Sequence, residues 1–167
     1  MEASEALGTA AQVAVALAGF AGVVVVFRTE AVHRWSALDR FRLRLLLANS
    51  MIPLALCLFG ILLLSLRPTP ITIWRWCSGF AILLLLPFAF LIMRSARTVA
   101  PEEFHADRIS RLIFYPLFLL GATVSLLQIY NAFFAGVFWE FFVAIIFQLF
   151  AAMLQFMRLI LLSPPRE

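Results

Sequence analysis

Long apolar stretches, separated by short polar ones, make up most of this chain. Because a helix needs about 20 apolar residues to cross a hydrocarbon core about 30 Å thick, each stretch is long enough to span a bilayer. The pattern therefore predicts an all-α protein, a five-helix transmembrane bundle in which residues 1–167 form a single integral membrane domain. The predicted spans are 7–27, 43–66, 71–93, 112–134 and 139–162.

Local signals refine the ends of these spans. Ser36 followed by Asp39 is typical of a helix start, so the second helix is expected to run from Ala37 to Leu66. Pro101 with the acids after it predicts a short helix leading into the fourth span. Residues 112–162 are almost continuously apolar, and Gly136 is the predicted turn. Helices 4 and 5 are then antiparallel neighbours.

The composition leaves no room for a second kind of domain. Hydrophobic residues make up 64% of the chain and charged residues only 13%, with a mean hydropathy of +1.02, whereas about a quarter of a soluble domain is charged. The polar segments between the spans are too short to bury a core of their own. We therefore expect the lipid bilayer as a partner, and no nucleic acid and no soluble catalytic domain.

The distribution of arginine predicts the orientation. The chain has 13 basic residues, all of them arginine. Eleven fall in the segments 28–44 and 94–111 and near the C-terminus, which alternate with segments that hold only Arg67 and Arg75. Short positively charged loops stay in the cytoplasm. The N-terminus is therefore expected outside and the C-terminus in the cytoplasm, in a bacterial inner (cell) membrane.

Small residues repeat along the first span. Ala10, Ala14, Ala18 and Gly22 recur every four residues, and small residues at this spacing let two membrane helices approach closely. Tight packing inside the bundle is the simpler interpretation. The alternative is that this helix packing face lines a conduit or docks another subunit.

Polar residues at membrane depth are costly and are therefore candidates for function. Arg75, Asn131 and Glu140 are expected at similar depth, about one turn inside the outer surface, where they form a candidate polar cluster. We expect an ion pair between Arg75 and Glu140 that joins helices 3, 4 and 5. A selectivity group at an outer mouth is the alternative.

A second set of polar residues lies deeper in the last two spans. Across the hairpin, the depth of Ser125 matches that of Gln148, and a hydrogen bond between them is expected. The alternative places Gln148 and Gln155 on a water-filled path. The candidate intramembrane polar stripe comprises Ser125, Gln128, Gln148 and Gln155.

No motif for catalysis or for cofactor binding is evident. The chain has no HExxH, P-loop, GxSxG or CxxC sequence, each of which carries a defined chemistry. We therefore expect no enzyme and no catalytic, metal or cofactor-binding residues. Arg40, Arg42 and Arg44 are instead expected to contact lipid headgroups.

The Ala-Leu-Ala-Gly-Phe-Ala-Gly sequence at 16–22, followed by Trp35 and the Asp-Arg-Phe-Arg sequence at 39–42, resembles small bacterial multi-span membrane proteins of unassigned function. The resemblance covers the first third of the chain and implies a membrane protein without implying an activity.

Three functions fit these patterns. The leading hypothesis is a non-enzymatic subunit that forms a homo-oligomer or assembles with other membrane subunits, because the chain has a small-residue helix and minimal loops. The second is a homo-oligomeric channel for ions or small solutes. The third is a lipid-binding or lipid-modifying protein that uses the arginines of its cytoplasmic face.

Overall fold

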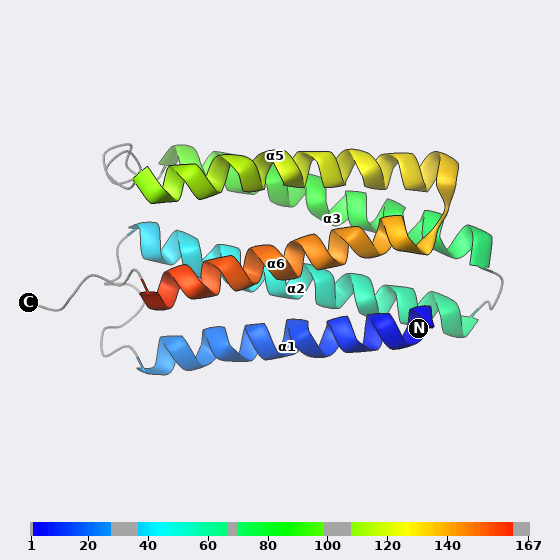
Figure 1. Cartoon of the computed structure of the whole chain (residues 1–167), viewed down its shortest axis with the longest axis horizontal. Coiled ribbons are helices and arrows are strands. Elements are labelled where there is room, and N and C mark those ends of the chain that lie inside the picture. Colours follow the sequence, from blue (N-terminus) through cyan, green and yellow to red (C-terminus); the bar gives the residue numbers. More distant parts are fainter. Residues whose placement is uncertain (1, 28–36, 67–69, 99–107, 162–167) are drawn as a thin grey trace, which may run out of the picture.

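In the computed structural model, which describes residues 2–27, 37–66, 70–98 and 108–161, the chain is a bundle of long helices (Figure 1). All five α-helices of the described residues are long and apolar enough to cross a membrane, which confirms the prediction of an all-α protein with five such helices. A short π-helix, η2, follows the fourth of them. The elements are α1 (Ala3–Phe27), α2 (Ala37–Leu66), α3 (Pro70–Thr98), α5 (Arg108–Tyr130), η2 (Asn131–Ala135) and α6 (Phe138–Leu161).

The helices lie side by side and roughly along one axis (Figure 1). α2 contacts α1, α3 and α6, whereas α5 contacts α3, α6 and η2. α1 and α5 therefore form opposite edges of the bundle. We refer to its two ends as the Ala3 end, where α1 begins, and the Phe27 end, where α1 finishes; the turn at Gly136 lies at the Ala3 end.

The core sits where α1, α2 and α6 meet. Leu7, Leu56, Phe141 and Ile145 are fully buried there. A Cβ on Gly60 would lie 2.9 Å from Cδ1 of Leu7, so the missing side chain at this position lets α1 approach α2. Since lipid is as apolar as leucine, such close packing is a main source of helix association in a bilayer.

The predicted packing face of α1 is only partly used inside the bundle. Ala10 and Ala14 are buried, Ala18 is half-buried and Gly22 is exposed. The stripe of α1 that is buried in the bundle is rotated from the predicted face and includes leucines as well as alanines. The buried residues of this stripe are Leu7, Ala10, Ala14, Leu17 and Ala21.

Two predictions concern the connections between helices, the turn at Gly136 and the short helix after Pro101. Gly136 is the predicted turn: it has a φ of 64°, a left-handed conformation that glycine adopts without steric cost. The helix expected after Pro101 lies outside the described residues.

Candidate functional site

A buried hydrogen-bonded network joins α3, α5 and α6 near the Ala3 end. Ser78 Oγ donates to Gln128 Oε1 (2.9 Å), and Asn131 Nδ2 donates to Ser78 Oγ (2.8 Å). Gln128 Nε2 in turn donates to the main-chain carbonyl of Glu140 (2.6 Å). Ser78, Gln128 and Asn131 are fully buried, so this network meets the requirement that buried polar groups be hydrogen-bonded.

Asn131 also holds the turn between η2 and α6. Its Oδ1 accepts from the N–H of Val137 (2.8 Å), and its Nδ2 donates to the carbonyl of Val137 (3.0 Å). The main-chain carbonyl of Asn131 accepts from the N–H of Gly136 (2.9 Å). One side chain thus satisfies main-chain groups that a helix end would leave without partners.

The expected ion pair between Arg75 and Glu140 is not formed; these two described residues are not within salt-bridge distance of each other. Arg75 Nη2 instead donates to the main-chain carbonyl of Phe134 (3.0 Å), at the C-terminal end of η2, where the helix dipole favours a cation. Glu140 lies in the first turn of α6, where an acid is favoured, and its Oε2 is buried without a hydrogen-bond partner. Of the predicted cluster, only Asn131 enters the network through its side chain.

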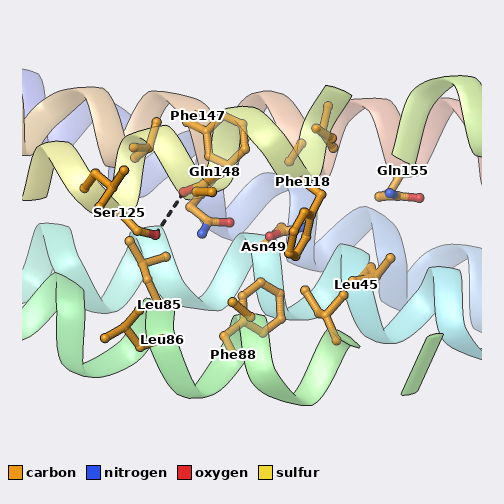
Figure 2. Close-up of a pocket in the computed structure, with 18 of the residues that line it drawn as sticks. Leu45, Asn49, Leu85, Leu86, Phe88, Phe118, Ser125, Phe147, Gln148 and Gln155 are labelled. Carbon is orange, nitrogen blue, oxygen red and sulfur yellow. Dashed lines mark hydrogen bonds between the residues drawn. The ribbon is translucent and has the colours of Figure 1, made fainter. Parts of the chain in front are cut away.

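An elongated cavity of about 370 Å³ lies between α2, α3, α5 and α6. This volume falls at the lower end of the range for small-molecule sites. Figure 2 shows Leu85, Leu86 and Phe88 of α3 along one wall, with Asn49 and Phe118 across from them. The lining residues are Leu45, Asn49, Leu85, Leu86, Phe88, Ala89, Ile92, Leu117, Phe118, Gly121, Ala122, Val124, Ser125, Leu126, Ile129, Phe147, Gln148, Ala151 and Gln155.

Most of this lining is apolar, and the few polar groups are spread along the cavity. Gln148 and Gln155 lie seven residues apart on α6, and Asn49 faces the space from α2 (Figure 2). Both glutamines are only 3% exposed, and the Oε1 atom of each is buried without a hydrogen-bond partner. An unsatisfied buried acceptor costs about 1–3 kcal/mol, so both oxygens favour a molecule that brings a donor.

Ser125 and Gln148, both among the described residues, do not form the expected hydrogen bond with each other. Ser125 Oγ donates to the carbonyl of Gly121 one turn earlier (2.9 Å), the bond drawn as a dashed line in Figure 2. This local bond satisfies the hydroxyl within its own helix. The predicted stripe is therefore divided: Gln128 belongs to the network, and Ser125, Gln148 and Gln155 line the cavity.

Sequence reasoning missed Ser78, which bridges Gln128 and Asn131. The signal was available, because Ser78 lies one turn after Arg75 and at a depth similar to that of Asn131. The contribution of α2 and α3 to the cavity could not be foreseen, because apolar wall residues look the same as residues facing lipid.

The arginines proposed to contact headgroups differ in exposure. Arg44 is exposed and Arg40 is half-buried, but Arg42 is only 6% exposed and its Nη1 lies 3.4 Å from Oδ1 of Asp39. Arg158, in the last turn of α6, is 8% exposed. Two buried cations are therefore present at the Phe27 end.

No protein-family model, no curated protein and no solved structure matches this chain.

Proposed function

We propose that this chain is a non-enzymatic, multi-pass membrane protein that binds an amphiphile, a molecule with an apolar chain and a polar group, in the cavity between α2, α3, α5 and α6. The observation that carries the proposal is the pair of buried glutamine oxygens without partners in an otherwise apolar cavity. An apolar wall with a few convergent polar groups is typical of ligand sites. Depth within the membrane favours a ligand that partitions into lipid.

Filling the cavity tests this proposal. Ala89 lines the cavity from α3, so Ala89→Phe is expected to weaken binding of a photoactivatable hexadecanol analogue about tenfold, which corresponds to about 1.4 kcal/mol. Labelling would be quantified in nanodiscs, and the labelled residues mapped by mass spectrometry. Leu91→Phe is the matched control, because Leu91 lies on the same helix and is 58% exposed.

The labelled positions decide the outcome. Labels on cavity-lining residues of α5 and α6 that disappear only in Ala89→Phe support the proposal. Labelling that is equal in both variants and the unmodified protein contradicts it.

A second candidate is the assembly function expected from the small-residue helix. Its support is the outward face of α1, where Gly19 and Gly22 are exposed and an added Cβ would meet no atom within 4 Å. A lipid-exposed face of this kind lets a second helix approach closely. Ala10 and Ala14, by contrast, are already used inside the bundle.

Enlarging the exposed glycines tests assembly. Gly19→Leu combined with Gly22→Leu is expected to remove most of the cross-linked dimer formed in native membranes, because the bulk of two leucines separates the helices. Val13→Leu, on another exposed part of α1, is the control and should leave the dimer yield unchanged. A double variant that cross-links as well as the control excludes this face as the interface.

We also propose that the Phe27 end faces the cytoplasm of a bacterial inner membrane. Support comes from the described arginines Arg40, Arg44 and Arg94, which lie near this end of α2 and α3, in agreement with the tendency of basic segments to remain inside.

A further inference from the structure

The polar side chains that line the cavity are mainly amides. Asn49 of α2 and Gln148 and Gln155 of α6 face this space and are 5%, 3% and 3% exposed. Among the described lining residues, Ser125 supplies the one other polar side chain, and its hydroxyl already donates to the carbonyl of Gly121. The three amides are therefore the side chains with which a ligand would form hydrogen bonds.

The amides form a row along the cavity. α2 and α6 run in opposite directions (Figure 1), and a Cβ on Gly60 would lie 3.6 Å from Cε1 of Phe141, so these two residues have a similar depth. Asn49 precedes Gly60 by eleven residues on α2. On α6, Gln148 and Gln155 follow Phe141 by seven and fourteen residues, so the level of the asparagine falls between them, as Figure 2 also shows. At 1.5 Å per residue, the asparagine lies about 5 Å along the axis from each glutamine.

The charge of the lining sets a limit on the ligand. None of the described residues that line the cavity is charged. A charged group that moves from water into such a space loses its hydration without meeting an opposite charge, which is costly. The cavity therefore favours an uncharged ligand.

The chemistry of the amides favours hydroxyl groups. A side-chain amide has an oxygen that accepts hydrogen bonds and a nitrogen that donates them. A hydroxyl can do both, whereas an ether or a sulfate oxygen only accepts. The Oε1 atoms of Gln148 and Gln155 are buried without partners, so each would gain a donor from a hydroxyl. A row of three amides suits a head group with more than one hydroxyl.

The wall formed by α3 suits the apolar part of such a ligand. Every described lining residue of α3 is apolar, and these residues are Leu85, Leu86, Phe88, Ala89 and Ile92. Figure 2 shows Asn49 across from this wall. The cavity therefore presents hydrogen-bonding groups from α2 and α6 and a hydrocarbon surface from α3.

We infer that the occupant of the cavity is an uncharged lipid with two or more hydroxyl groups, such as a monoacylglycerol, whose hydroxyls bind the amides of Asn49, Gln148 and Gln155 and whose hydrocarbon chain packs against α3. This inference rests on the proposed function, to which it adds the charge and the head-group chemistry of the ligand.

Binding of four probes with the same chain length tests the inference. Monopalmitoylglycerol has two hydroxyls, hexadecanol has one, hexadecyl methyl ether has none, and hexadecyl sulfate has a permanent negative charge. Each would compete with the photoactivatable hexadecanol analogue for the unmodified protein in neutral detergent, with a correction for partition into protein-free micelles. We expect hexadecanol to bind about fivefold more tightly than the ether, and monopalmitoylglycerol about fivefold more tightly again, the worth of one neutral hydrogen bond each. The sulfate is expected to bind no more tightly than the ether.

Substitution of the glutamines gives the second arm. Gln148→Met combined with Gln155→Met keeps side chains of similar length and removes both amides. This double variant is expected to reduce the preference for monopalmitoylglycerol over the ether about fivefold and to change ether binding by less than twofold. Ser125→Ala is the matched control, because it also removes a polar group from the lining, but one whose hydrogen bond lies within α5. It should leave the preference unchanged.

The outcomes separate the inference from the proposed function. If the ether or the sulfate binds as tightly as monopalmitoylglycerol, or if the double variant keeps the full preference, the inference is overturned, while amphiphile binding stands as long as Ala89→Phe weakens the probes. If Ala89→Phe weakens none of the four, amphiphile binding itself fails. If the double variant does not fold, the order in which the unmodified protein binds the four probes decides the inference alone.

Discussion

At the scale of single residues, the buried amides fall into two kinds. Asn131 has its side-chain groups engaged by Ser78 and by the main chain of Val137. Gln148, at similar burial, has an Oε1 with no partner. Loss of a satisfied buried group costs stability, whereas replacing an unsatisfied one with an apolar group can gain it. The first kind therefore builds the fold, and the second is available to a ligand.

This difference predicts that replacement by leucine changes the free energy of unfolding differently at Asn131 and at Gln148. Asn131→Leu removes three side-chain hydrogen bonds. Because each such bond contributes about 0.6 kcal/mol in a membrane protein, the substitution should lower the free energy of unfolding by about 2 kcal/mol. Gln148→Leu is its matched counterpart and should leave the free energy of unfolding of the ligand-free protein unchanged or slightly raised. Unfolding by steric trapping in bicelles measures both. An equal loss in the two variants would show that Gln148 is a structural residue and would remove the polar anchor of the cavity.

At the scale of elements, the sequence determines the helices well and their contacts poorly. The spans follow from hydropathy and length, and the turn at Gly136 follows from the only glycine between two apolar runs, so both were predictable. Likewise, α2 begins at Ala37, where the sequence pattern predicted a helix start. These signals are local, and each acts within a few residues along the chain.

The partners of the polar side chains depend on helix rotation, which no local signal gives. Arg75 was expected to pair with Glu140, but it donates instead to the carbonyl of Phe134, in the η2 segment that packs against α3. Ser125 likewise bonds within its own helix. Depth can be counted along a sequence, whereas the direction of a side chain around its helix depends on packing against neighbours.

At the scale of the whole molecule, charge and polarity divide the bundle along its axis. The hydrogen-bonded network of Ser78, Gln128 and Asn131 lies near the Ala3 end, and the buried arginines Arg42 and Arg158 lie at the Phe27 end. The cavity lies between α2, α3, α5 and α6, and the orientation of the bundle decides which end of the cavity is nearer to the cytoplasm.

The orientation of the chain is a prediction that labelling can test. With the N-terminus outside, Ser4→Cys should react with a membrane-impermeant maleimide in intact cells, because Ser4 is exposed at the start of α1. The native Cys57 and Cys77 are buried and should stay unlabelled, so the unmodified protein is the background control. A fluorescent protein fused to the C-terminus should be fluorescent, as expected for a cytoplasmic location. If Ser4→Cys reacts only after the membrane is permeabilised, the bundle is inverted, and its Phe27 end faces the outside.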